Sequence, residues 1–118
     1  MIYFLKRLKY RCIWSWQGIV ATWHDEHSFR SWVWANLVSI LAAFLLPLST
    51  SERALILVLG LLVLASELMN TGIENAIDYI SKEQHPLAKK AKDAGSAGVF
   101  LTAVAAGVAW IVILIGLL

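Results

Sequence analysis

The stretch SERALILVLGLLVLASELMNTGIENAIDYI, residues 51–80, decides the fold of this chain. Its first half is almost wholly apolar, and carboxylates interrupt the apolar pattern only from Glu67 onwards. The 13 uncharged residues 54–66 are too few to span a bilayer, which takes about 20. The sequence therefore predicts one long helix, with its first half in lipid and its second half polar on one face. Thr50 or Ser51 is the expected N-cap.

Two further stretches contain no Asp, Glu, Lys or Arg, and each is long enough to span a membrane. They are residues 31–51, with 21 residues, and residues 94–118, with 25. Pro86 can open the helix that contains the second stretch. The expected spans are about 30–48, 51–80 and 87–118.

The composition agrees with a membrane protein. The 118 residues are 59% hydrophobic and 15% charged, and the mean hydropathy is +0.70. A soluble domain is about 45–50% apolar and about 25% charged, so soluble globular, disordered and disulfide-stapled classes are disfavoured. Cys12 is alone and cannot form an internal disulfide. The length suits a single membrane domain, residues 1–118.

The N-terminal segment differs from the spans, because it begins with a basic cluster and contains several Trp. Its apolar residues recur every three or four positions, which is typical of an amphipathic helix on the membrane surface, at about 3–27. A signal peptide would also place basic residues before an apolar run. Gln17 and the lack of an A-x-A site disfavour that alternative. The apolar stripe consists of Leu5, Leu8, Cys12, Trp16, Ile19 and Trp23.

The distribution of Lys and Arg predicts the orientation. Of the 10 such residues, five precede the first span and four lie between the second and third. Only Arg53 lies in the turn between the first and second spans. Since basic loops stay in the cytoplasm, we expect the N-terminus and the second loop there, and the C-terminus outside.

A polar face runs along the second half of the long helix. Because its members are three, four, seven and eleven residues from the first, they lie on one side. Ionisable groups inside a span are costly and usually functional, and neighbouring carboxylates need cations such as a hard divalent ion. Alternatively, Asp78 lies in water at the end of the helix, and Asn70 only forms a hydrogen bond between helices. The face consists of Glu67, Asn70, Thr71, Glu74 and Asp78.

A basic stretch, HPLAKKAKDAGSAGVF at residues 85–100, precedes the third span. The ammonium groups of Lys89, Lys90 and Lys92 could hold phosphates, or could simply anchor the span on its cytoplasmic side. The small residues that follow predict close helix packing, or room for a ligand to approach.

The joint HDEHSFR, residues 24–30, brings acids into a basic region. His24 and His27 lack a third zinc ligand at a suitable spacing, so phosphate binding or metal support is the favoured role. No G-x-x-x-x-G-K-[ST] or G-x-G-x-x-G motif is present. Nucleic-acid binding has no support, because the membrane explains the basic residues.

Three blocks, WSWQGIVATWHDEHSFR (14–30), ELMNTGIENAIDYI (67–80) and AKDAGSAGV (91–99), together resemble the small prokaryotic diacylglycerol kinase family. The pattern E-x-x-N-[ST]-x-I-E-x-x-x-D, followed by A-K-D-x-x-[SA]-[AG], is highly specific, and the resemblance covers nearly the whole chain. It implies an all-α homotrimer in the bacterial inner membrane, with one surface helix and three spans per protomer. It also implies ATP-dependent phosphorylation of diacylglycerol to phosphatidic acid.

The resemblance also implies roles for single residues. Glu67 would be the general base, Asn70 would orient the catalytic groups, and Lys92 would contact the transferring phosphoryl group. Glu26 and Glu74 would hold the Mg²⁺ that bridges the ATP phosphates. Arg7, Trp14, Asp78 and Asp93 would also lie around the nucleotide, and Gly95 and Ser96 would permit close packing.

Some features leave alternatives open. Trp32 stands where some family members carry an acid, so an extra acidic contact there is in doubt. HPLAK, residues 85–89, resembles the undecaprenol kinase branch, whereas the Trp-rich surface helix and the joint favour diacylglycerol. A small multidrug-type transporter or a non-enzymatic assembly subunit would not explain a polar helix face beside a Lys-Asp pair. Since one protomer offers little shelter, we expect an oligomer with shared sites.

Overall fold

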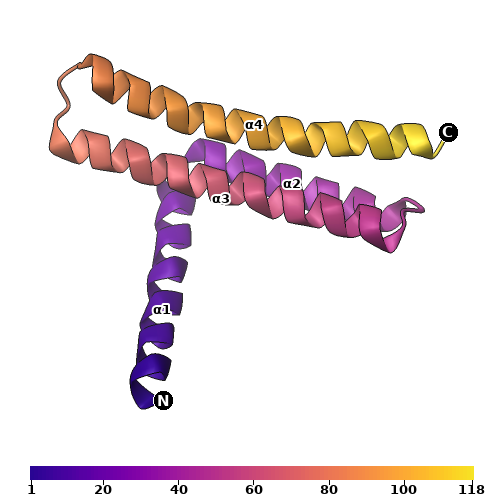
Figure 1. The fold of residues 1–118 in the computed structure, drawn as a ribbon, viewed down its shortest axis with the longest axis horizontal. Coiled ribbons are helices and arrows are strands. Elements are labelled where there is room, and N and C mark those ends of the chain that lie inside the picture. Colours follow the sequence, from indigo (N-terminus) through magenta and orange to yellow (C-terminus); the bar gives the residue numbers. More distant parts are fainter.

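A computed structural model describes all 118 residues, which form four helices and no strand. The helices are α1 (Ile2–Asp25), α2 (His27–Leu45), α3 (Thr50–Ile80) and α4 (Pro86–Gly116). Figure 1 shows α2, α3 and α4 running alongside one another, while α1 stands crosswise to them. Helix α3 packs against both α2 and α4, and α1 contacts α2 and α3 but not α4.

A capping box fixes the start of α3. The Ser49 hydroxyl accepts a hydrogen bond from the Glu52 N–H at 3.2 Å, and the Glu52 carboxylate accepts from the Ser49 N–H at 2.8 Å. The N-cap expected at Thr50 or Ser51 is therefore wrong. A Glu at the third helical position reaches back only to the residue three before it, and that residue is Ser49.

The lengths of the helices place them in the membrane. Three helices, α2, α3 and α4, are long and apolar enough to cross it. The 19 residues of α2 span about 28 Å, close to the ~30 Å hydrocarbon thickness, whereas the 31 residues of α3 or α4 span about 46 Å. Figure 1 shows the excess at one end, where α3 and α4 extend past the start of α2. The chain is thus an all-helical membrane protein whose two longest helices project from the bilayer.

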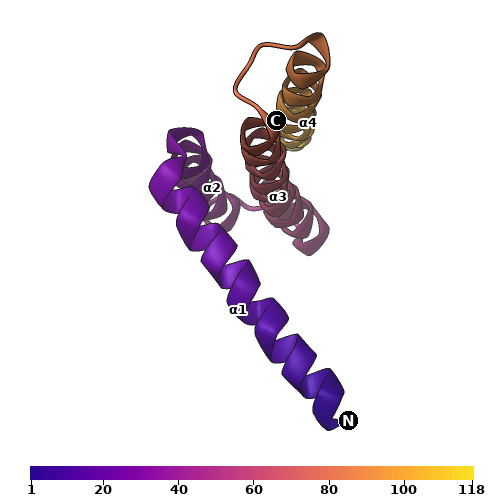
Figure 2. The same ribbon diagram turned by 90° about the vertical axis from the view of Figure 1, so that its left-hand side faces the viewer.

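The two ends of the bundle differ in charge. The junction of α1 with α2 and the loop between α3 and α4 lie toward one end, and the α2–α3 turn and the C-terminus lie at the other (Figures 1 and 2). Arg53, the one basic residue at the second end, closes the α2–α3 turn. Its guanidinium donates to the carbonyls of Ala43 at 2.8 Å and Leu48 at 3.3 Å, and it lies over the Phe44 ring.

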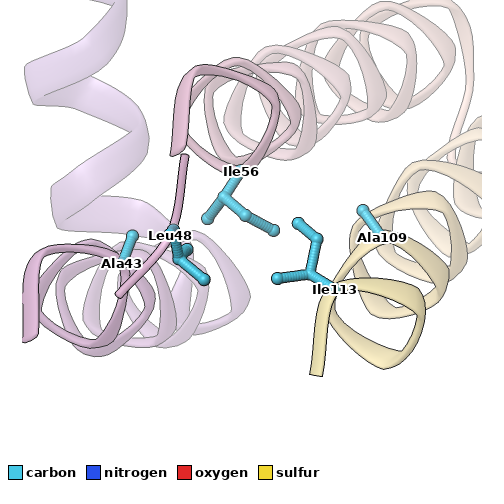
Figure 3. Packing of buried hydrophobic residues seen from close by; sticks show 5 residues of the cluster. All are labelled: Ala43, Leu48, Ile56, Ala109 and Ile113. Carbon is cyan, nitrogen blue, oxygen red and sulfur yellow. The ribbon is translucent and has the colours of Figure 1, made fainter. Parts of the chain in front are cut away.

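The hydrophobic core is small and lies near the α2–α3 turn. Figure 3 shows its buried residues meeting between α2, α3 and α4. Only 12 of 118 residues are buried, so most apolar side chains face outward to lipid or to other chains. Two polar contacts tie α4 to the other spans, Trp110 Nε1 to Ser39 Oγ at 2.9 Å and Ser66 Oγ to Thr102 Oγ1 at 2.8 Å. The core consists of Ala43, Leu48, Ile56, Ala109 and Ile113.

Candidate active site

The corner between α1 and α2 is built around Glu26. This residue has an extended backbone, ends α1 and serves as the N-cap of α2, yet its side chain makes no capping hydrogen bond. Arg30 stabilises the corner instead, because its guanidinium donates to the carbonyls of Trp23 and His24 at the end of α1. The half-buried Glu26 carboxylate is therefore free to bind a cation.

Glu67 lies beside this corner. Its side chain is only 5% exposed, and its Oε2 accepts a hydrogen bond from the Ser28 hydroxyl at 3.5 Å. Ser28 belongs to the first turn of α2, so Glu67 sits where the surface helix meets the spans, at the membrane surface. Glu74 follows two turns later on α3, and Glu26 precedes Ser28 by two residues at the end of α1.

Asn70 lies one turn further along α3. Its Nδ2 donates to Glu74 Oε1 at 3.3 Å, and its buried Oδ1 has no hydrogen-bond donor. This side chain lies against Gly95 of α4, where an added Cβ would collide with Oδ1. Gly95 therefore permits the close packing expected of it, whereas Ser96 is exposed.

The chemistry of the Glu74 side chain suits a hard divalent cation. Its carboxylate accepts a hydrogen bond from Asn70 Nδ2, and Mg²⁺ prefers oxygen ligands. No three His, Cys, Asp or Glu side chains form a complete metal cage. Mg²⁺ normally uses one or two protein carboxylates and completes its shell with water and phosphate, so these residues suit it better than zinc.

Beyond the membrane surface, α3 and α4 enclose a charged cavity of about 620 Å³. The Lys92 ammonium pairs with Asp78 at 2.6 Å across the two helices, and Lys89 pairs with Asp93 along α4. The cavity has a volume typical of small-molecule sites, and Asp78, Lys92 and Asp93 all line it.

The loop before α4 forms the far wall of this cavity, which the sequence did not predict. Ser81, Glu83 and His85 line it. The imidazole Nδ1 of His85 accepts a hydrogen bond from the Leu87 N–H at 3.1 Å, so His85 is the N-cap of α4, with Pro86 opening the helix as expected. A short polar loop ahead of a helix-opening Pro was the only available signal.

Arg7 and Trp14 are not brought to this cavity within one chain. Both lie on α1, which has no contact with α4 and points away from it (Figure 2). The Arg7 guanidinium lies over the Tyr3 ring, and Trp14 stacks on Tyr10 with ring centroids 5.9 Å apart. Their role at a nucleotide stays a prediction.

An apolar groove of about 540 Å³ lies near the corner between α1 and α2. Residues of α1, α2 and α3 form it, and all of them are hydrophobic. Two of its lining residues, Leu68 and Phe29, are next in sequence to Glu67 and Ser28. Its lining is Trp16, Ile19, Val20, Trp23, Phe29, Val33, Leu61, Leu64, Ala65 and Leu68.

These features define a helical membrane protein with a carboxylate-bearing polar face on α3, an apolar groove along α1, α2 and α3, and a charged cavity where α3 ends and α4 begins. The profile of the family described as prokaryotic diacylglycerol kinase matches residues 13–114. The chain belongs to this family.

Curated relatives share this family name. The chain is 44% identical to the diacylglycerol kinase of Pseudomonas aeruginosa over 112 residues, which cover 95% of this chain and 91% of that protein. It is 35% identical to the diacylglycerol kinase of Escherichia coli strain K12 over 100 residues, 85% of this chain and 82% of that one. With the diacylglycerol kinase of Helicobacter pylori strain 26695 it shares 39% identity over 92 residues, 78% of this chain and 72% of that one.

Proposed function

We propose that this protein transfers the γ-phosphoryl group of ATP to the free hydroxyl of diacylglycerol, producing phosphatidic acid and ADP. One observation carries the proposal. The Glu67 carboxylate is buried beside the junction of α1 and α2, in a chain that carries an apolar groove along α1, α2 and α3 and a charged cavity where α3 ends and α4 begins. A kinase for a lipid alcohol needs both an apolar and a charged site, because one substrate stays in the bilayer and the other arrives from water.

The apolar groove suits the acyl chains of the lipid. A diacylglycerol lying in it would present its hydroxyl at the end where Leu68 and Phe29 flank Glu67 and Ser28. Glu67 would then accept the hydroxyl proton as the lipid oxygen attacks. The new bond joins this oxygen to the γ-phosphorus, and the bond from the γ-phosphorus to the bridging oxygen of ADP breaks.

The charged cavity suits the nucleotide. The phosphate chain would extend from it toward Glu67, along the face that carries Asn70 and Glu74. Glu67 and Glu74 are seven residues apart, or about 10 Å along the helix, which leaves room for the γ-phosphate between them. Lys92 would neutralise charge on the transferring phosphoryl group. The Lys92 ammonium pairs with the Asp78 carboxylate at 2.6 Å. Arg7, Trp14 and Asp93 would complete the nucleotide site.

Magnesium would be held by Glu74 and Glu26. When bound, it would supply positive charge to the phosphate groups of ATP. Asn70 keeps the Glu74 carboxylate in place through its Nδ2 hydrogen bond.

We further propose that the chain, as a single membrane domain, assembles into a homotrimer in the bacterial inner membrane with its N-terminus in the cytoplasm. The many outward apolar side chains and the distance of Arg7 and Trp14 from the charged cavity support sites completed between protomers. The end that carries nine of ten basic residues would face the cytoplasm, where ATP is available.

A phosphorylation assay in detergent micelles tests the proposed activity. Purified protein is given labelled ATP with diacylglycerol or with undecaprenol, and we expect label in phosphatidic acid. Glu67→Gln should abolish most turnover without changing the helix content or the oligomeric state. Glu52→Gln is the matched control, since Gln still completes a capping box at the far end of α3.

Label only in undecaprenyl phosphate would move the chain to the polyprenol branch of the family. ATP use with neither lipid would refute a lipid kinase, and wild-type turnover in Glu67→Gln would remove Glu67 from the reaction.

A further inference from the structure

The first turn of α2 offers the Glu67 carboxylate a neutral donor. The Ser28 hydroxyl donates to Oε2 at 3.5 Å. This contact restricts the directions in which the carboxylate points.

No Lys or Arg side chain forms an ion pair with the Glu67 carboxylate. The two ion pairs of the protein are Lys89 with Asp93 and Lys92 with Asp78, and neither includes Glu67. An ion pair would compete with the lipid proton for the carboxylate. A hydroxyl donor orients the carboxylate and leaves one oxygen free to accept a proton.

The corner also explains why the Ser28 hydroxyl is available. Ser near the start of a helix commonly bonds to a carbonyl one turn back, as Ser31 does with the His27 carbonyl at 3.1 Å. For Ser28 that carbonyl belongs to His24 in α1, where Arg30 already donates at 3.0 Å. The Arg30 contact thus frees Ser28 to turn toward α3.

The start of α2 adds to this effect. The first N–H groups of a helix have no partner inside the helix, and they give this end a partial positive charge. Glu67, brought here by Ser28, lies at that end. A buried carboxylate without a cation is stabilised by such a position.

We propose that Ser28 is a positioning residue for the reaction, one that holds Oε2 of Glu67 so that Oε1 faces the hydroxyl of the lipid. This inference rests on the proposed function, because it assigns Glu67 the role of base.

The test compares three variants in the micelle assay. Ser28→Ala should lower kcat about 10- to 150-fold, the range expected when one hydrogen bond to a charged group is lost, with little change in KM for ATP or diacylglycerol. Ser28→Thr keeps the hydroxyl and should restore most of kcat. Ser31→Ala is the matched control on the same helix, since its hydroxyl bonds only to its own helix.

A double-mutant comparison separates positioning from a structural effect. In the Glu67→Gln background, Ser28→Ala should cause no further loss, because the two residues act through one carboxylate. Wild-type kcat in Ser28→Ala, alongside an inactive Glu67→Gln, would overturn the role of Ser28 and leave the proposed function standing. An inactive wild-type protein would instead refute the proposed function. Equal losses in Ser28→Ala and Ser28→Thr would show that packing, rather than the hydroxyl, matters at this position.

Discussion

Replacing Gly95 with Ala tests how α3 and α4 hold the catalytic groups. The added Cβ would collide with Asn70 Oδ1, and it would lie 3.4 Å from both Asn70 Cγ and Ile73 Cδ1. Overpacking of this kind costs about 1–3 kcal/mol, while Ala in place of Gly inside a helix gains about 1 kcal/mol. The net loss of stability should therefore be at most about 2 kcal/mol, and the fold should survive.

Gly95→Ala should impair catalysis more than it lowers the free energy of unfolding. Asn70 is held at Glu74 by one 3.3 Å hydrogen bond, worth about 1 kcal/mol, so this side chain moves before the helix backbone does. A displacement of about 1 Å in a positioned catalytic group can cost roughly 10²-fold in rate. We expect Gly95→Ala to lower kcat by 10- to 100-fold, roughly 1.4–2.7 kcal/mol in the barrier.

The measurement is kcat in mixed micelles together with a thermal or detergent unfolding curve. Gly98→Ala is the control, because nothing within the chain lies within 4 Å of a Cβ at Gly98, and it should keep near-normal kcat. Normal turnover in Gly95→Ala would show that the Asn70 position against α4 is irrelevant to catalysis, and the geometry described for this site would then be wrong.

Three further predictions concern the metal, the orientation and the capping box. Glu74→Ala and Glu26→Ala should each raise the Mg²⁺ concentration needed for half-maximal activity more than they weaken lipid binding; an unchanged Mg²⁺ titration in Glu26→Ala would confine the metal to α3. A C-terminal reporter that works only outside the cytoplasm should be active, and activity of a cytoplasm-only reporter would contradict the three-span orientation. Ser49→Ala should lower the free energy of unfolding by about 1 kcal/mol with unchanged kcat, because the α2–α3 turn lies at the end opposite the site; a large fall in kcat would mean that the two ends are coupled.

Local patterns were sufficient to predict the helices and much of the candidate site. Apolar periodicity and length indicated a surface helix and three spans, because the spacing of side chains around a helix follows from the chain alone. The same regularity placed Glu67, Asn70 and Glu74 on one face. The start of α3 was misplaced because three neighbouring residues can each cap a helix, and only the reciprocal bonds with Glu52 select Ser49.

The sequence by itself therefore determined which segments are helical and which face of residues 67–78 is polar. The tertiary structure decided what that face contacts. The hydrogen bond from Ser28 sets Glu67 beside the junction of α1 and α2. Tertiary packing also set Asn70 against Gly95, added the loop before α4 to the charged cavity, and left Arg7 and Trp14 away from it. The physical reason is that such contacts depend on where two helices meet along their axes, and no local spacing of residues specifies that position.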